Sequence, residues 1–317
     1  MAGTAAEGSG RVLVGIGDDA SVVQASGVSV TSVDAMVEGT HFRLGPHFSE
    51  PAEVGHRALA GALSDLAAMG ARPGEAYFVL GLPHGFSEQR ALELMRAAGD
   101  LAAETGTVIA GGDVVVAPVL MVSVTAVGSA PDAGALVARA GTRVGDLVGV
   151  TGTLGAAAAA LAQMEGRAPR TPAGAPALQR AAFPRPRLRE GRALAEQGAH
   201  AMIDLSDGVA TDAARLGERS GVELVLRLEE LPLAEGVPEV ADALGLPPWG
   251  LAAGGGEDYE LCFTADPCDR ERLERAIAAE GSVGLTWIGT VREGPPGAVL
   301  LDGEGREVEL EGYEHRW

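Results

Sequence analysis

The stretch AMIDLSDGVATD, residues 201–212, joins a short apolar run to a segment with helical patterning through an acidic turn. This order of residues is typical of a strand that leads into a helix. Asp204 and Asp207 are three residues apart across the junction, so both side chains can face one ligand. Two other interpretations stay open: Ser206 could be the N-cap of the helix, and Asp207 an acid favoured by the helix dipole.

The same alternation of strands and helices continues in both directions along the chain. Strands are expected at residues 11–16, 27–33, 75–82, 107–110, 119–128, 146–152, 201–206, 222–228, 258–264, 285–290 and 298–302. Helices are expected at residues 51–69, 87–104, 154–164, 207–218 and 269–279, the second with Ser87 as its N-cap. The expected fold class is therefore mixed α/β.

The length of 317 residues favours two domains. Residues 129–145 are rich in Gly, Ala and Pro, which indicates a boundary between domains 1–135 and 136–317. Residues 169–192 are rich in Pro and Arg. This segment is interpreted either as a solvated connection that enters a helix or as a segment that contacts an anion.

Seven aspartates stand at the ends of apolar runs or in Gly-rich turns: Asp18, Asp19, Asp34, Asp65, Asp113, Asp204 and Asp207. The chain contains no lysine that could neutralise them. Buried carboxylates must be paired with a cation or bind a metal, and Mg²⁺ prefers carboxylate oxygen together with substrate phosphates. A turn explains each GDD or GGD motif taken singly, but their recurrence in similar contexts indicates a site that holds several metal ions and phosphate.

Three further residues are weighed individually. Asp65 lies in a helical segment with hardly any other polar group, where a lone buried carboxylate is costly, so a functional role is favoured. His41, in VEGTHF, is either a structural histidine or a site residue. Glu257, in GGGEDYELCF, follows glycines that allow close approach to a ligand, although a turn before a strand explains it nearly as well.

The composition excludes several classes of protein. A formal net charge of −20 repels nucleic-acid backbones, so no nucleic-acid partner is expected. The first residues do not resemble a signal peptide, and no apolar stretch is long enough to span a bilayer, so a cytoplasmic enzyme without a membrane partner is expected. Without lysine no P-loop is possible, and no nucleophile elbow or protein-kinase motif occurs.

Taken in order, several motifs resemble the thiamine-monophosphate kinase family, which shares its fold with aminoimidazole ribonucleotide synthetase. They are GIGDDA, VDAMVEGTHF, ALSDLAAMGARP, GGDV, TRVGDLVGVTGTLG, PRPRLREG, AMIDLSDGVATD, GGGEDYELCFT and GYEH, and they span nearly the whole chain. The resemblance implies an N-terminal α/β domain that binds metal and ATP and dimerises through its sheet, and a C-terminal α/β domain that completes the active site. It also implies ATP-dependent phosphorylation of thiamine monophosphate to thiamine diphosphate with several Mg²⁺ ions.

The resemblance assigns roles to particular residues. The implied metal ligands are Asp19, Ser32, Asp34, Asp65, Asp113, Asp204 and Asp207. The implied ATP contacts are Gly112, Asp113, Arg139 and Ser206. The implied contacts to thiamine monophosphate are His41, Glu257 and Tyr313.

The chain departs from the family pattern in a few places, none of which removes an acid. Val33 stands where Thr is common, Ala62 replaces a frequent Asn, and GGDVVV lacks the polar residues often found after GGD. Two rival hypotheses remain: another ATP-dependent enzyme of this fold, of the synthetase or dehydratase type, and a protein that binds nucleotide and metal without turnover.

Overall fold

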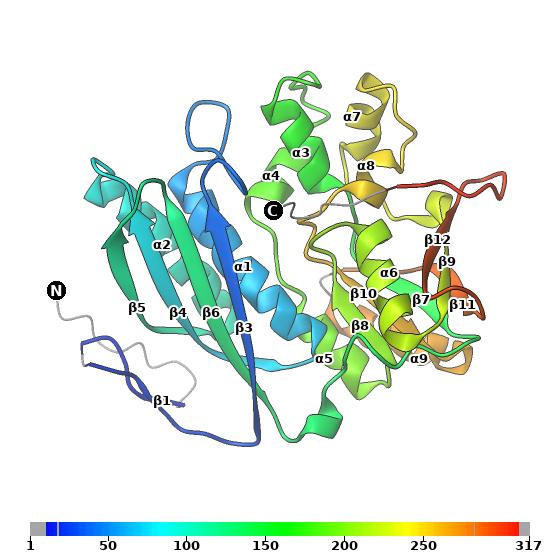
Figure 1. Ribbon diagram of the computed structural model, residues 1–317, viewed down its shortest axis with the longest axis horizontal. Helices are drawn as coiled ribbons and strands as arrows, with labels where there is room; N and C mark the ends of the chain where they lie inside the picture. Colours follow the sequence, from blue (N-terminus) through cyan, green and yellow to red (C-terminus); the bar gives the residue numbers. More distant parts are fainter. Residues whose placement is uncertain (1–10, 18, 282, 311–317) are drawn as a thin grey trace. The chain divides into compact units, whose positions relative to one another are not determined.

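Figure 1 shows the computed structural model of the protein, which describes residues 11–17, 19–281 and 283–310. By its internal contacts the chain divides into two compact units. Unit 1 runs to Leu66 and takes in Ala71–Ala135 and Ala182–Leu188, whereas unit 2 contains Ala67–Gly70, Leu136–Ala181 and the chain from Arg189 onward. Each unit contains its own β-sheet and helices, which confirms the mixed α/β class.

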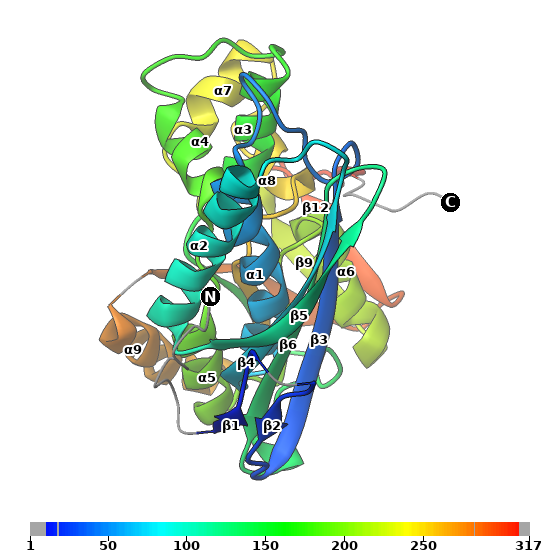
Figure 2. The ribbon, with the colours of Figure 1, turned by 90° about the vertical axis from the view of Figure 1, so that its left-hand side faces the viewer.

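Unit 1 is built on a four-stranded sheet with the order β3-β6-β4-β5. The strands are β3 (Val28–Val37), β4 (Arg72–Leu82), β5 (Val108–Val116) and β6 (Met121–Ala130), and only the β4–β5 pair is parallel. Helices α1 (Pro51–Ala68) and α2 (Glu88–Thr105) both lie on one face of this sheet (Figure 2). A short ribbon of β1 (Val12–Val14) and β2 (Val22–Val23) precedes the sheet.

The central strand β6 shows how the sequence separates the two faces of this sheet. Its side chains alternate between buried and half-buried, because successive residues of a strand point to opposite faces. Val122, Val124 and Ala126 are almost completely buried in the core that α1 and α2 cover. On the other face, Val33 of β3 is 68% exposed and Val79 of β4 is 37% exposed.

Unit 2 is built on a six-stranded sheet with the order β12-β9-β11-β7-β10-β8. The strands are β7 (Leu147–Thr151), β8 (Ala201–Asp204), β9 (Glu223–Arg227), β10 (Leu261–Ala265), β11 (Leu285–Arg292) and β12 (Gly297–Leu301). Only β12 and β9 pair in parallel. The core of this sheet includes residues of α6 (Val209–Ser220), among them the fully buried Ala213 and Leu216; α5 (Leu188–Glu196) and α9 (Arg270–Glu280) belong to the same part of the chain.

A second hydrophobic core in unit 2 is made mainly by short helices. Helices α3 (Ala156–Met164), α4 (Ala175–Ala182), α7 (Val237–Ala243) and α8 (Gly250–Gly254) contribute to it. Three single-turn 3₁₀ helices complete the described elements: η1 (Ala133–Ala135), η2 (Leu228–Glu230) and η3 (Pro267–Asp269). The alanines of α3 supply small buried side chains, so the helices can pack closely.

Several elements differ from the sequence predictions. Helix α4 lies in the segment that was interpreted as a connection, and α7 and α8 were not predicted. Strands β3 and β5 run further than expected, so Asp34 and Asp113 lie inside strands and not at their ends. The N-cap at Ser87 is confirmed, since its side chain accepts the backbone N–H of Arg90 at 3.3 Å. Among the described helices, none has both the length and the apolar character that crossing a membrane requires.

Candidate active site

In unit 1, strand β3 and helix α1 bring a hydroxyl and a carboxylate together. Ser32 and Asp34 are two residues apart on β3, so both side chains lie on the face that the helices cover. The Ser32 hydroxyl donates a short hydrogen bond to Oδ2 of Asp65 on α1. Asp65 is half-buried, whereas the residues around it in α1 are almost all buried apolar side chains. These two elements therefore place several oxygen donors on one side of the sheet.

A local irregularity of strand β5 determines the position of Asp113. The pairing of β5 with β4 shifts register between Ala76 and Tyr77, which is the signature of a β-bulge. Gly112 has a φ of +152°, and a Cβ there would lie 1.9 Å from the carbonyl oxygen of Phe78, so only glycine fits. The exposed Asp113 follows directly, and its Oδ1 accepts the backbone N–H of Val114 at 2.8 Å.

The other residues assigned to unit 1 lie in turns. Asp19 is exposed in the turn between β1 and β2. His41 follows β3, and its Nδ1 accepts the backbone N–H of Val37 at 3.1 Å, so the ring hydrogen is on Nε2. Asp18 and Tyr313, and with Tyr313 the GYEH motif, lie outside the described residues.

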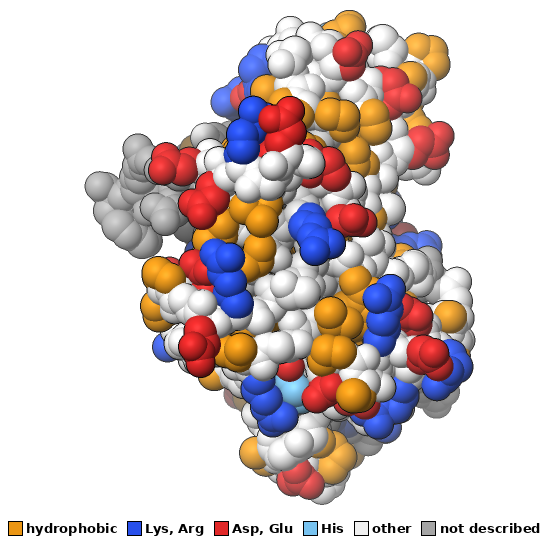
Figure 3. Space-filling model, turned by 90° about the vertical axis from the view of Figure 1, so that its right-hand side faces the viewer, with side chains coloured by type: hydrophobic (Ala, Val, Ile, Leu, Met, Phe, Trp, Pro, Cys, Tyr) orange, Lys and Arg blue, Asp and Glu red, His pale blue; other side chains and the backbone are white. Residues whose placement is uncertain are grey.

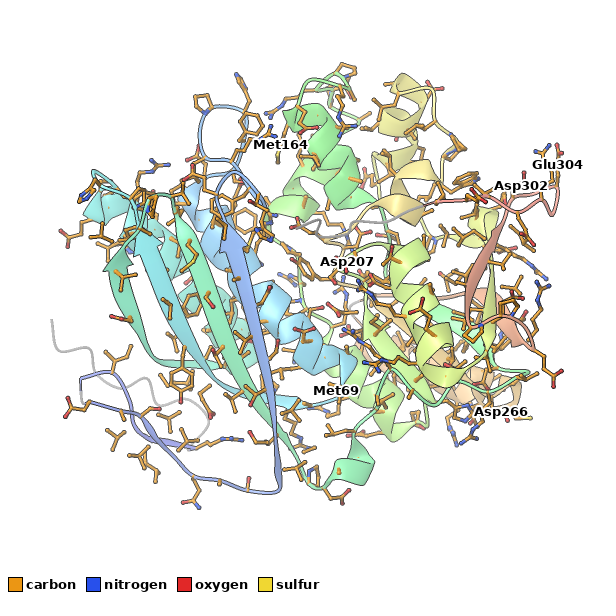
Figure 4. All side chains as sticks on the ribbon, in the orientation of Figure 1. Met69, Met164, Asp207, Asp266, Asp302 and Glu304 are labelled. Carbon is orange, nitrogen blue, oxygen red and sulfur yellow. The ribbon has the colours of Figure 1, made fainter. Side chains whose placement is uncertain are left out.

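In unit 2, the acidic turn after β8 is organised by an aspartate that the sequence analysis missed. Asp212 lies in the first turn of α6 and is completely buried. Its Oδ2 accepts the backbone N–H groups of Ser206 at 3.1 Å and of Asp207 at 2.9 Å. Figure 4 shows Asp207 near the beginning of α6. The signal that could have revealed Asp212 is an acid one turn into a helix that follows a tight SDG turn.

The same turn contains a cation. Nη1 of Arg215 donates to Oδ2 of Asp207 at 2.6 Å and to Oδ1 of Asp212 at 2.9 Å. Burial raises the pKa of Asp212 to about 6, and the charge of Asp207 adds to the rise, whereas the two backbone N–H groups and Arg215 oppose it. Arg215 therefore links the half-buried carboxylate of Asp207 to the buried carboxylate of Asp212.

The interpretation of Ser206 as an N-cap is wrong. The N-cap of α6 is Gly208, which makes no side-chain cap, and the helix begins at Val209. The N–H groups of Ser206 and Asp207 are bonded instead by the side chain of Asp212, which follows the turn in the chain. Ser206 is therefore free of a capping role, and its backbone carbonyl contacts another loop.

That second loop is the GGGED segment before β10. The backbone N–H of Glu257 donates to the carbonyl of Ser206 at 2.9 Å, and that of Tyr259 donates to Leu205 at 3.0 Å. A Cβ at Gly256 would lie 2.2 Å from the Ser206 carbonyl oxygen, so glycine is required at this contact. The structure therefore brings together Asp204, Ser206, Asp207 and Glu257, four of the predicted site residues. Arg139 is exposed in the loop between η1 and β7.

The donor atoms suit a hard divalent cation. Ser32, Asp34 and Asp65 in unit 1, and Asp204 and Asp207 in unit 2, offer hydroxyl and carboxylate oxygen, as Mg²⁺ prefers. Among residues 11–17, 19–281 and 283–310, no group of three or more His, Cys, Asp or Glu side chains is positioned to hold a metal ion. The set of seven metal ligands remains a prediction.

Elsewhere on the surface, charges are mixed. On the face shown in Figure 3, acidic and basic side chains are interspersed. Many of the arginines are paired, as in Arg306–Asp302 at 2.8 Å and Arg270–Glu274 at 2.9 Å. In the Pro- and Arg-rich segment, Arg187 is buried and Arg185 lies 3.9 Å from Glu104, so the segment is more than a solvated connection.

Both parts of the chain match known family models. Residues 17–130 match "AIR synthase related protein, N-terminal domain", and residues 143–302 match "AIR synthase related protein, C-terminal domain". The thiamine-monophosphate kinase of Mycobacterium tuberculosis is 36% identical over 299 residues, which cover 92% of this chain and 83% of that protein.

Solved structures show the same similarity. The thiamine-monophosphate kinase of Stenotrophomonas maltophilia superimposes with a TM-score of 0.83 at 32% identity, over 94% of this chain and 92% of that one. A structure of "AaThiL complexed with AMPPCP and TMP" gives a TM-score of 0.80 at 29% identity, over 91% and 87% of the two chains. The chain therefore belongs to the AIR synthase related proteins and, within them, to the thiamine-monophosphate kinase family.

Proposed function

We infer that this protein transfers a phosphoryl group from ATP to thiamine monophosphate and forms thiamine diphosphate. The observation that carries this inference is the family match over nearly the whole chain, together with a related structure that binds the ATP analogue AMPPCP and TMP. The hydroxyl and carboxylate oxygens of Ser32 and Asp65 and of Asp207 support it, because Mg²⁺ prefers such ligands together with substrate phosphates.

The chemistry needs no general base. The second pKa of a phosphate monoester is about 6, so thiamine monophosphate is largely a dianion at neutral pH. One of its phosphate oxygens forms a bond to the γ-phosphorus of ATP, and the bond from that phosphorus to the bridging oxygen breaks, which releases ADP. The principal barrier is the repulsion between two polyanions, which grows as water is excluded.

We propose that several Mg²⁺ ions are the resident cations, held among them by Asp19, Ser32, Asp34, Asp65, Asp113, Asp204 and Asp207. When bound, they would neutralise the phosphate charge and align the two reactants. The contribution of the protein is to fix these oxygens: the hydroxyl of Ser32 orients Asp65, and Arg215 orients Asp207.

The remaining roles concern the two substrates. We assign Gly112, Asp113, Arg139 and Ser206 to ATP, and His41, Glu257 and Tyr313 to thiamine monophosphate. Nε2 of His41 is a hydrogen-bond donor in the tautomer that its contact with Val37 selects, which suits an anionic phosphate.

A single incubation tests the function. The protein is mixed with ATP, MgCl₂ and thiamine monophosphate, and thiamine diphosphate, ADP and inorganic phosphate are followed together. We expect thiamine diphosphate to appear in step with ADP and without inorganic phosphate. ADP and inorganic phosphate without thiamine diphosphate would indicate another ATP-dependent reaction on this fold, and nucleotide binding without ADP would indicate a binding protein.

We also propose that the protein is a homodimer that pairs through the open face of the unit 1 sheet. This face carries the exposed side chains of Val33 on β3, Val79 on β4 and Val115 on β5. An exposed apolar sheet face of this kind is expected to be covered by a partner.

Light scattering tests the dimer. We expect a mass of twice the 32.1 kDa chain for the wild type, and a monomer for Val79→Arg, because a charge at the centre of the interface would be desolvated. Leu246→Arg is the matched control, since Leu246 is also exposed, at 42%, but belongs to unit 2. A wild-type monomer at micromolar concentration would exclude the proposal.

A further inference from the structure

The GGGED loop of unit 2 has an internal feature that no role described so far uses. Asp258, between the site residue Glu257 and Tyr259, is 93% buried, as follows from its 7% exposure. Its Oδ2 accepts the backbone N–H of Gly155, the N-cap of α3, at 2.7 Å. Its Oδ1 is also buried and has no hydrogen-bond partner among the described residues, which is unusual for a native carboxylate.

Glu260, two residues further on, also attaches the loop to the segment between β7 and α3. Its carboxylate is completely buried and accepts the hydroxyl hydrogen of Thr151 at 2.7 Å. Nη2 of Arg180 makes a short ion pair with it and also donates to the carbonyl of Thr153 at 3.1 Å. The side chains of Asp258 and Glu260 therefore attach this loop to the segment between β7 and α3.

The backbone of the same loop is attached to a different segment. The N–H groups of Glu257 and Tyr259 donate to Ser206 and Leu205, and Leu205 in turn donates to the carbonyl of Glu260 at 2.8 Å. Residues 257–260 therefore join two turns: side chains at 258 and 260 hold one, and backbone groups at 257 and 259 hold the other. The segment between them has little freedom to move independently.

The backbone conformation confirms that this loop is held under constraint. Glu257 has a φ of +62° and Tyr259 a φ of +51°, and both are non-glycine residues in the left-handed region. Such conformations persist only where the surrounding structure determines them, and they concentrate at ligand sites. Asp258 lies between the two constrained residues, and its side chain makes the contact with α3.

We propose that Asp258 is a positioning residue, whose buried carboxylate anchors the loop to the N-terminus of α3 and so fixes Glu257, assigned to thiamine monophosphate, and Ser206, assigned to ATP. The part that concerns the substrate rests on the proposed function. The part that concerns the loop rests only on the contacts within unit 2. The anchored carboxylate is the stronger hydrogen-bond acceptor when it is ionised.

The surroundings of Asp258 make its charge sensitive to pH near neutrality. Burial raises its pKa to about 7; the N–H groups of Gly155 and Ala157 and the charge of Arg180 oppose the rise, and the charge of Glu260 adds to it. Arg180 on α4, Glu260 before β10 and the N-terminus of α3 are the charged or polar groups that face it. Ionisation strengthens the hydrogen bond to Gly155, but the raised pKa shows that the cost of burying the charge is larger, so the anchor weakens as the pH rises through about 7.

Hydrogen exchange tests the anchor without any assay of activity. The variants are Asp258→Asn, which keeps the shape but not the charge, and Asp258→Ala. Asp266→Asn is the matched control, because Oδ1 of Asp266 also accepts a helix-start N–H, from Cys268 at 2.8 Å, and Figure 4 shows it far from Asp207. We expect exchange in peptides covering residues 205–208 and 254–260 to be on the order of tenfold faster in both Asp258 variants, and unchanged in the control.

Kinetics test the consequence for the substrate. We expect the KM for thiamine monophosphate to rise on the order of tenfold in Asp258→Asn at pH 6, because the amide places N–H donors without acceptors in a buried site; kcat should change less. In the wild type, ionisation of Asp258 raises this KM as the pH rises through about 7. The variant lacks that dependence and keeps only the one near pH 6 that belongs to the substrate phosphate.

The outcomes distinguish the positioning role of Asp258 from the proposed function. Unchanged exchange in folded Asp258→Asn, or an identical pH profile, would overturn the positioning role. If Asp258→Ala does not fold, the Asp258→Asn measurements decide. If the wild type forms no thiamine diphosphate, the proposed function fails, while the exchange rates still test the anchor.

Discussion

The two oxygen-rich regions of the molecule are built by different means. In unit 1, Asp34 and Asp65 project from a strand and a helix, and the contact that orients Asp65 is a hydroxyl. In unit 2, Asp207 lies on a turn that a buried carboxylate and an arginine hold together. Neutral donors orient a carboxylate without cancelling its charge, whereas an arginine both orients it and reduces its charge.

This difference indicates that the two regions have different roles. A carboxylate oriented by Ser32 keeps its full attraction for a divalent cation, so the unit 1 region is suited to carry the strongest metal contacts. The unit 2 region has a fixed shape with part of its charge already compensated, which is suited to orienting substrates. Each of the following experiments tests one side of that comparison.

The largest effect is expected from Asp65→Asn. The change keeps the shape and the contact with Ser32 but removes the charge, so thiamine diphosphate formation should fall on the order of a thousandfold. The measurement is kcat/KM at saturating MgCl₂, with direct Mn²⁺ titration of the protein as a second readout. Asp100→Asn is the control, since Asp100 is exposed on α2 of the same unit. Wild-type turnover in Asp65→Asn would refute the role assigned to unit 1.

The next largest effect concerns stability in unit 2. The pKa of Asp258 is raised to about 7 in the folded protein, against about 3.9 in the unfolded chain, so its contribution to stability is complete below pH 4 and is lost as the pH rises to 7. The loss amounts to about 4 kcal/mol at most, at about 1.36 kcal/mol for each pH unit. Urea unfolding at pH 5 and pH 8 should show a smaller pH dependence for Asp258→Asn than for the wild type. Equal dependence would mean that this acid is ionised in both states.

Sequence patterns were sufficient to predict helices and strands where the apolar periodicity is strong. The alternating apolar residues of β6 and the apolar length of α1 predicted these elements with bounds close to those observed. The family followed from motifs spread over the whole chain, and the comparisons with known proteins confirm it.

Other features were not predicted, because they arise from contacts that the apolar periodicity does not show. The role of Asp212 depends on how the turn before α6 folds back onto the first turn of that helix, and the anchor at Asp258 depends on Gly155, which is 103 residues away along the chain. Helix α4 was missed because it has only eight residues and lies in a Pro-rich segment, too short for a clear helical pattern; its buried Ala177 belongs to the core made with residues of α3 and α7.

A moderate effect is expected from Arg215→Met. The change leaves the buried carboxylate of Asp212 without its cation and releases Asp207, so unfolding free energy should fall by about 2 kcal/mol, a value reduced because Arg215 is one-third exposed. Mn²⁺ affinity should fall on the order of tenfold through the lost orientation of Asp207. Arg219→Met, an exposed position on the same helix, is the control. A rise in Mn²⁺ affinity would show that Arg215 competes with the cation and does not position its ligand.

The smallest effect is expected for an arginine–carboxylate ion pair that is exposed to solvent. Arg275 and Glu271 form an ion pair of 3.2 Å one turn apart on α9, with side chains 71% and 83% exposed. Such pairs stabilise a helix by about 0.5 kcal/mol or less, because solvent screens them and ordering them costs entropy. Glu271→Gln should therefore leave urea unfolding and turnover within error of the wild type, whereas Arg215→Met changes both. If the two substitutions had equal effects on stability, burial of Asp212 would not be the cause of the difference.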